Sequence, residues 1–89
     1  MIAAEVITMV WVTAAEHVDG YRIRLRFNDG VEGVVDLRET IRSDSRELFR
    51  QLTAPGEFEK FRVESDTVVW ENGLDLAPEF LYELADKSA

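Results

Sequence analysis

The side chains best suited to chemistry lie near the C-terminal end of the sequence. Asp75 follows an Asn-Gly pair and is flanked by two leucines. Its carboxyl group either lies partly buried in a binding groove or caps a turn or the helix that begins near Pro78. In the first interpretation Trp70, Asn72 and Tyr82 line the groove with it. An enzyme would need a second group in a defined role, and no partner for Asp75 can be assigned, so no catalytic residue is predicted.

The residue types give little support for disulfide, metal or nucleotide-binding chemistry. The chain has no cysteine, which excludes disulfides, thiolate metal sites and cysteine nucleophiles. Its single histidine, His17, is interpreted as a solvated loop residue. The carboxylates do not follow the spacing of a calcium-binding loop, and no glycine-rich phosphate-binding motif is present. We therefore predict no metal site and no cofactor.

The balance of charge limits the possible partners. The 18 acidic residues outnumber the 10 basic ones, for a net charge of −8. Such a chain repels phosphate backbones, so direct nucleic-acid binding is disfavoured. Arg22, Arg24 and Arg26 form one basic row. The row is either a solvated strand face neutralised by Glu32 and Asp36 or a set of phosphate contacts.

The central element is a predicted β-hairpin over residues 21–37. Apolar residues alternate with the three arginines, the period of a half-buried strand. A two-residue turn would pair Phe27 with Glu32 and place acids on the apolar face. A three-residue turn pairs Leu25 with Gly33 and Ile23 with Val35, and it keeps apolar residues together. Gly30 is then expected to adopt a left-handed conformation.

Period and turn residues predict the remaining elements. We expect a first strand over Glu5–Val12, a loop over Thr13–Gly20, and a second hairpin over Phe61–Trp70 turning at Ser65-Asp66. Between the hairpins lies a helical segment broken near Ser43, with Ile41, Leu48, Phe49 and Leu52 on one face, and Asp44 can cap its helix over Ser45–Leu52. A short turn from Pro55 to Glu59 places Phe58 inward, and a helix from Pro78 has Phe80, Leu81 and Leu84 inward.

These elements define an α+β fold: a mostly antiparallel sheet of two hairpins plus an N-terminal strand, with two or three short helices packed on one face. We expect one domain over residues 1–89, with a structured core of about 5–85 and a frayed tail at 86–89. The apolar N-terminal stretch contains Glu5 and is too short to span a bilayer. A cytoplasmic protein without a membrane segment is expected. The predicted core comprises Ile23, Leu25, Phe27, Phe49, Leu52, Phe61, Val63, Trp70 and Leu81.

A possible interface lies on the second side of the sheet. The first predicted strand is apolar on both faces, and the short chain has few elements to cover both. An exposed Trp11 beside Ile7, Met9 and Val34 would form an apolar patch of the kind that marks an interface. The alternative is that these residues are covered, with Trp11 and Trp70 both in the core.

Several motifs together resemble a family of small bacterial domains, the domain-of-unknown-function family 2442. The resemblance covers about residues 5–82 and includes an NDG turn, a VDL exit, a VxW-NG-DL-P run and a closing LY. Glu71 stands where the family pattern more usually has Pro. The matching residues are Asn28-Asp29-Gly30, Val35-Asp36-Leu37, Val68-Val69-Trp70, Asn72-Gly73, Asp75-Leu76, Pro78 and Leu81-Tyr82.

The resemblance implies a compact α+β domain and brings no activity with it. Some relatives stand beside another small protein in an arrangement similar to a toxin–antitoxin pair. We therefore expect a non-enzymatic interaction or regulatory module, possibly antitoxin-like, that binds a small protein partner or a second copy of itself. One alternative is a small-ligand-binding protein or enzyme with a groove around Asp75, Trp70 and Tyr82. A third possibility is a DNA-associated regulator that acts through a partner.

Overall fold

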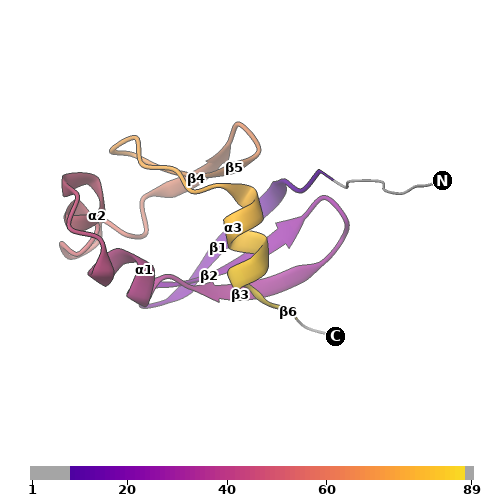
Figure 1. Ribbon diagram of the computed structural model, residues 1–89, viewed down its shortest axis with the longest axis horizontal. Helices are drawn as coiled ribbons and strands as arrows, with labels where there is room; N and C mark the ends of the chain where they lie inside the picture. Colours follow the sequence, from indigo (N-terminus) through magenta and orange to yellow (C-terminus); the bar gives the residue numbers. More distant parts are fainter. Residues whose placement is uncertain (1–8, 88–89) are drawn as a thin grey trace.

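A four-stranded antiparallel sheet is the framework of the protein (Figure 1). The computed structural model describes residues 9–87. The strands are β1 (Val12–Asp19), β2 (Arg22–Phe27), β3 (Glu32–Asp36) and the two-residue β6 (Asp86–Lys87), in the order β1-β2-β3-β6. The predicted α+β class is confirmed. None of the helices within residues 9–87 is long and apolar enough to cross a membrane.

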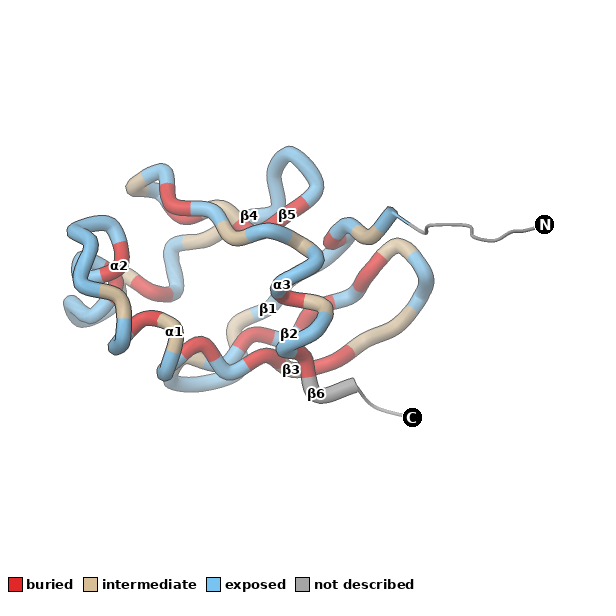
Figure 2. The backbone as a smooth tube through the Cα atoms, in the orientation of Figure 1, coloured by how far each residue is buried: buried red, intermediate tan, exposed pale blue. Residues whose placement is uncertain are grey.

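The β2–β3 hairpin has the predicted register. Leu25 lies opposite Gly33 and Ile23 opposite Val35. The backbone N–H of Phe27 donates to the carbonyl of Val31 over 2.9 Å and closes a three-residue turn. Burial alternates along β2, with the arginines exposed and the apolar residues covered (Figure 2). The register follows from the pattern because a one-residue slip would exchange the two faces.

Gly30 adopts the predicted left-handed conformation, with φ of +88°. A Cβ at this position would meet no atom within 4 Å, so a substitution is opposed by backbone strain alone. We expect Gly30→Val to lower the free energy of unfolding by more than about 1 kcal/mol, because β-branched residues are strained there. Urea denaturation measures the loss. Gly30→Asn is the control, since Asn tolerates this conformation. An unchanged midpoint for Gly30→Val would contradict the argument.

The first strand lies later in the chain than predicted. β1 occupies most of the segment expected to be a loop, and of the predicted strand Glu5–Val12 only Val12 belongs to β1; residues 5–8 lie outside the described residues. Pairing with β2 places Ala15 opposite Leu25 and is irregular at both ends of β1. Two alanines and these irregularities hide the period-two pattern, which explains why the sequence did not indicate the strand. His17 is accordingly a strand residue.

Two short helices follow β3. They are α1 (Arg38–Ser43) and α2 (Glu47–Gln51), and the chain breaks near Ser43 as predicted. Arg46 occupies the N-cap of α2, so the predicted Asp44 cap is wrong. Asp44 instead accepts hydrogen bonds from the Arg46 side chain and backbone, which lower the pKa of its carboxyl group to about 2. Leu48, expected inward, is exposed because so short a helix turns only Phe49 fully inward.

The second hairpin forms a separate sheet of β4 (Phe61–Glu64) and β5 (Thr67–Trp70). The expectation of a single sheet is therefore replaced by two. Its register is as predicted: Phe61 lies opposite Trp70 and Val63 opposite Val68. Ser65 and Asp66 both have positive φ, as a type I′ turn requires. The preceding turn buries Phe58, as expected.

The C-terminal helix α3 (Pro78–Leu84) packs on the β2–β3 hairpin and begins at the predicted proline. Leu81 is fully buried. Phe80 and Leu84 are exposed, against the prediction, because the buried side of this short helix is occupied by Leu81 and partly by Tyr82. The chain then returns as β6, which pairs with Gly33 and Val34. Residues 86–87 are therefore a short strand and not a frayed end.

One hydrophobic core joins the two sheets and the helices. It contains seven of the nine predicted core residues, while Phe61 is half-buried and Val63 is exposed. Val63 is exposed although it lies opposite the fully buried Val68. The burial of Val63 therefore depends on its position in the fold and not on its strand face alone. The buried residues are Val12, Ile23, Leu25, Phe27, Val35, Leu37, Ile41, Phe49, Leu52, Phe58, Val68, Trp70, Leu74, Leu81 and Ala85.

Candidate functional site

The predicted groove residues of β5 and its following turn have structural partners. Trp70 is only 1% exposed, and its indole Nε1 donates to the carbonyl of Phe58 over 2.8 Å. The side-chain amide of Asn72 donates to the carbonyl of Leu48 over 3.0 Å and to Oε1 of Gln51 over 2.9 Å. Trp70 therefore belongs to the core, and Asn72 ties the β5 turn to α2.

The other two predicted groove residues, Asp75 and Tyr82, contact different parts of the protein. Asp75 is exposed and forms a backbone bridge with Val69, and the N-cap of α3 has no side-chain hydrogen bond that Asp75 could supply. The Tyr82 hydroxyl donates to Oδ2 of Asp29 over 2.8 Å, a bond that raises the pKa of Tyr82. The four predicted groove residues therefore each contact a different part of the fold.

Met9 and Trp11 of the predicted interface are held beside the tip of the β2–β3 hairpin. Asn28 Oδ1 accepts a hydrogen bond from the backbone N–H of Trp11 over 2.8 Å, and its Nδ2 donates to the carbonyl of Met9 over 2.9 Å. The backbone N–H of Asn28 also donates to the Trp11 carbonyl over 3.0 Å. Both side chains are nevertheless exposed, Met9 by 71% and Trp11 by 38%. We call these two residues the Met9–Trp11 surface.

The remaining interface residues do not join this surface. Val34 is half-buried opposite Arg24, in the middle of the sheet. Arg24 is four residues from Asn28, which is about 13 Å along an extended strand. Ile7 lies outside the described residues. Of the predicted patch, the structure therefore places Met9 and Trp11 together and Val34 apart.

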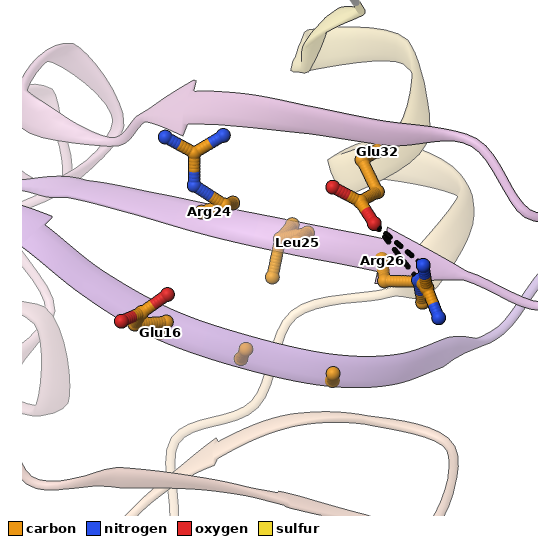
Figure 3. Close-up of a pocket in the computed structure, with 7 residues that line it drawn as sticks. Glu16, Arg24, Leu25, Arg26 and Glu32 are labelled. Atoms are coloured by element: carbon orange, nitrogen blue, oxygen red, sulfur yellow. Dashed lines mark hydrogen bonds and ion pairs between the residues drawn. The ribbon is translucent and has the colours of Figure 1, made fainter.

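A shallow hollow of about 290 Å³ lies on the arginine-bearing face of the main sheet (Figure 3). Glu16, Arg24 and the Arg26–Glu32 pair surround it, and Leu25 and two alanines of β1 complete its lining. The Arg26 guanidinium lies 2.8 Å from Oε2 of Glu32, whereas Arg24 has no ion pair among the described residues. Ligand pockets usually enclose most of their ligand, and this open depression does not have that form.

The arginine row is largely neutralised within the sheet. Glu32 pairs with Arg26, as predicted, but Arg22 pairs with Asp19 at 2.7 Å and not with Asp36. The hydrogen bond from Arg22 lowers the pKa of the Asp19 carboxyl group. Asp36 accepts a bond from the backbone N–H of Arg38 instead. These pairs favour the interpretation of a solvated charged face over a row of phosphate contacts.

Asn28 is the residue that holds the Met9–Trp11 surface in place. The sequence predicts Asn28 only as the first residue of a turn, whereas in the structure its side chain also fixes the backbone that carries Met9 and Trp11. The side-chain amide of an asparagine that begins a turn offers both a hydrogen-bond donor and an acceptor to other segments. Nothing in the sequence indicates that a segment 17 residues earlier uses them.

The fold and these surfaces define a small α+β domain with an exposed, backbone-anchored tryptophan and an uncovered charged sheet face. Residues 12–87 match the family described as "Protein of unknown function (DUF2442)", and the chain belongs to this family. The predicted resemblance is thereby confirmed. No curated protein and no solved structure matched the chain. The family description assigns no activity, so a functional hypothesis has to rest on the surfaces themselves.

Proposed function

We propose that the protein is a non-enzymatic protein-interaction module and that the Met9–Trp11 surface is its contact site. The observation that carries this proposal is that Trp11 is exposed while its backbone is held by Asn28. Tryptophan is enriched among the residues that dominate binding energy. A side chain presented from an already ordered backbone loses less entropy on binding. The partner is a protein, and a regulatory, antitoxin-like role would follow if the partner is a small toxic protein.

The net charge of −8 supports a basic partner. Opposite charges speed the encounter of two proteins and lose this effect as salt increases. Apolar contacts at Met9 and Trp11 would then hold the complex once it has formed. The ligand-binding alternative receives less support, because Trp70 is in the core and Tyr82 is bound to Asp29.

Trp11→Glu tests the proposal, with Val18→Glu as a matched control. Both residues are exposed by 38%, and Val18 lies at the far end of β1. We expect Trp11→Glu to weaken association by at least about tenfold, since burying a charge in an apolar contact is costly. Val18→Glu changes the net charge equally and should associate as the wild type does.

The measurement has two parts. Tagged wild-type protein is purified from its native host, and a partner recovered in stoichiometric amount is identified, produced and titrated against each variant in sedimentation experiments. Wild type alone is run at several concentrations to detect self-association. Far-ultraviolet circular dichroism establishes that the variants are folded. A folded Trp11→Glu protein that associates like the wild type would remove this surface, and a wild type that associates with nothing would remove the proposed function.

A further inference from the structure

The outward side of helix α3 carries two exposed apolar side chains. Phe80 is 42% exposed and Leu84 is 41% exposed. They are four residues apart, so they lie one turn from each other on the same side of the helix. Leu81 and Tyr82 anchor the helix on its other side, where Leu81 is fully buried and the Tyr82 ring packs on Phe27. The apolar pair is therefore not needed to attach α3 to the domain.

Acidic residues line one flank of this pair. Glu79 and Glu83 are also one turn apart, are both exposed, and have no ion pair among the described residues. The neighbouring sequence is also acidic, because residues 71–85 contain four acids and no base. Those acids are Glu71, Asp75, Glu79 and Glu83.

The apolar pair and its acidic flank together favour one kind of binding partner. A second copy of the chain would place the same acidic helix against this one, and like charges in an interface are repulsive. A helix with an apolar stripe could pack on Phe80 and Leu84 by the usual helix–helix contacts. Lysines or arginines beside that stripe would then lie against Glu79 and Glu83.

We propose that the outward side of α3 is a docking surface for a basic amphipathic helix of a partner protein. The surface uses neither Met9 nor Trp11, so it is a second contact site with a defined partner chemistry. Apolar packing provides the affinity, and the two glutamates set the orientation of the incoming helix and the salt dependence of its binding.

The test uses a synthetic amphipathic helix with leucines on one face and lysines on the other, titrated into the full-length protein by calorimetry. We expect saturable binding that weakens between low and high salt. Phe80→Ser combined with Leu84→Ser should weaken it by at least about tenfold. Glu79→Gln combined with Glu83→Gln should weaken it mainly at low salt and flatten its salt dependence.

Matched controls exclude general stickiness and general charge. Val18→Ser with Val63→Ser removes two apolar side chains of similar exposure elsewhere on the surface. Glu16→Gln with Glu39→Gln removes two exposed carboxylates from other elements. Both control pairs should bind the peptide like the wild type, and a peptide with glutamate in place of lysine should not bind.

Two results would overturn this inference. One is a wild type that does not bind the leucine–lysine helix, and the other is a control pair that loses as much affinity as the α3 pair. Concentration-dependent dimerisation abolished by the Phe80 and Leu84 changes would instead assign the surface to a second copy. Trp11→Glu should leave peptide binding unchanged, so failure of this surface is distinguishable from failure of the Met9–Trp11 surface.

Discussion

Trp70→Ala should unfold a large fraction of the protein at room temperature. Trp70 is 1% exposed and joins two parts of the core, with ring centroids 5.7 Å from Phe58 and 6.0 Å from Phe61. Replacing a buried Trp or Phe by Ala typically costs about 3–5 kcal/mol. Domains of this kind have a total stability of about 5–15 kcal/mol, so for a domain at the lower end of that range the loss removes most of the stability. The loss also removes the hydrogen bond from Nε1 to the Phe58 carbonyl.

Equilibrium urea unfolding measures this effect, followed by circular dichroism and by the fluorescence of Trp11, which remains as a probe. Trp70→Phe is the informative control because it keeps a ring in the core but leaves the Phe58 carbonyl without its donor. Its cost should be smaller and include about 1–3 kcal/mol for the unsatisfied buried group. If Trp70→Ala unfolded at the wild-type midpoint, the placement of β5 over the core would be wrong.

The second large effect is expected for Phe27→Ala, again about 3–5 kcal/mol. Phe27 is 1% exposed, lies opposite Val12 of β1, and packs edge-on against Tyr82 with ring centroids 4.8 Å apart. Truncating it leaves a cavity where β1, β2 and α3 meet. The surrounding elements cannot collapse into that cavity without breaking the sheet register or displacing the helix.

Phe80→Ala provides a matched comparison because it makes the same chemical change at an exposed position of α3. Exposed substitutions usually change stability by no more than about 0.5 kcal/mol, so the two midpoints should differ clearly. Thermal unfolding gives an independent reading, since about 1 kcal/mol shifts Tm by roughly 4–8 °C in a domain of this size. Equal stabilities for the two variants would mean that the inner face of β2 has been misassigned.

The two proposed contact sites make different demands on a partner. The Met9–Trp11 surface would supply an aromatic anchor at the hairpin tip, whereas α3 would supply an apolar pair with an acidic flank. Association through either site with a basic partner should be faster at low salt. The shallow hollow around Arg24 is electrostatically mixed and favours neither kind of partner by its charge.

Local structure was determined by the sequence itself. The register of both hairpins, the left-handed Gly30 and the start of α3 at Pro78 agree with the predictions. These features depend on neighbouring residues: period-two burial selects a register, and turn residues fix the reversal. Family membership was predictable for the same reason, since its motifs are continuous stretches of sequence.

Long-range packing decided the rest. β1 is a strand because β2 pairs with it, although its alanines and irregular pairing conceal the pattern. The two hairpins could have shared a sheet, and only the tertiary structure separates them. Asn28 holds the backbone of Trp11 at the hairpin tip, and the Trp11 side chain is exposed there. Phe80 faces outward because Leu81 and Tyr82 take the buried side of α3. Apolar residues tend to be buried. Which of them are buried in this protein depends on packing against segments that are distant in the chain.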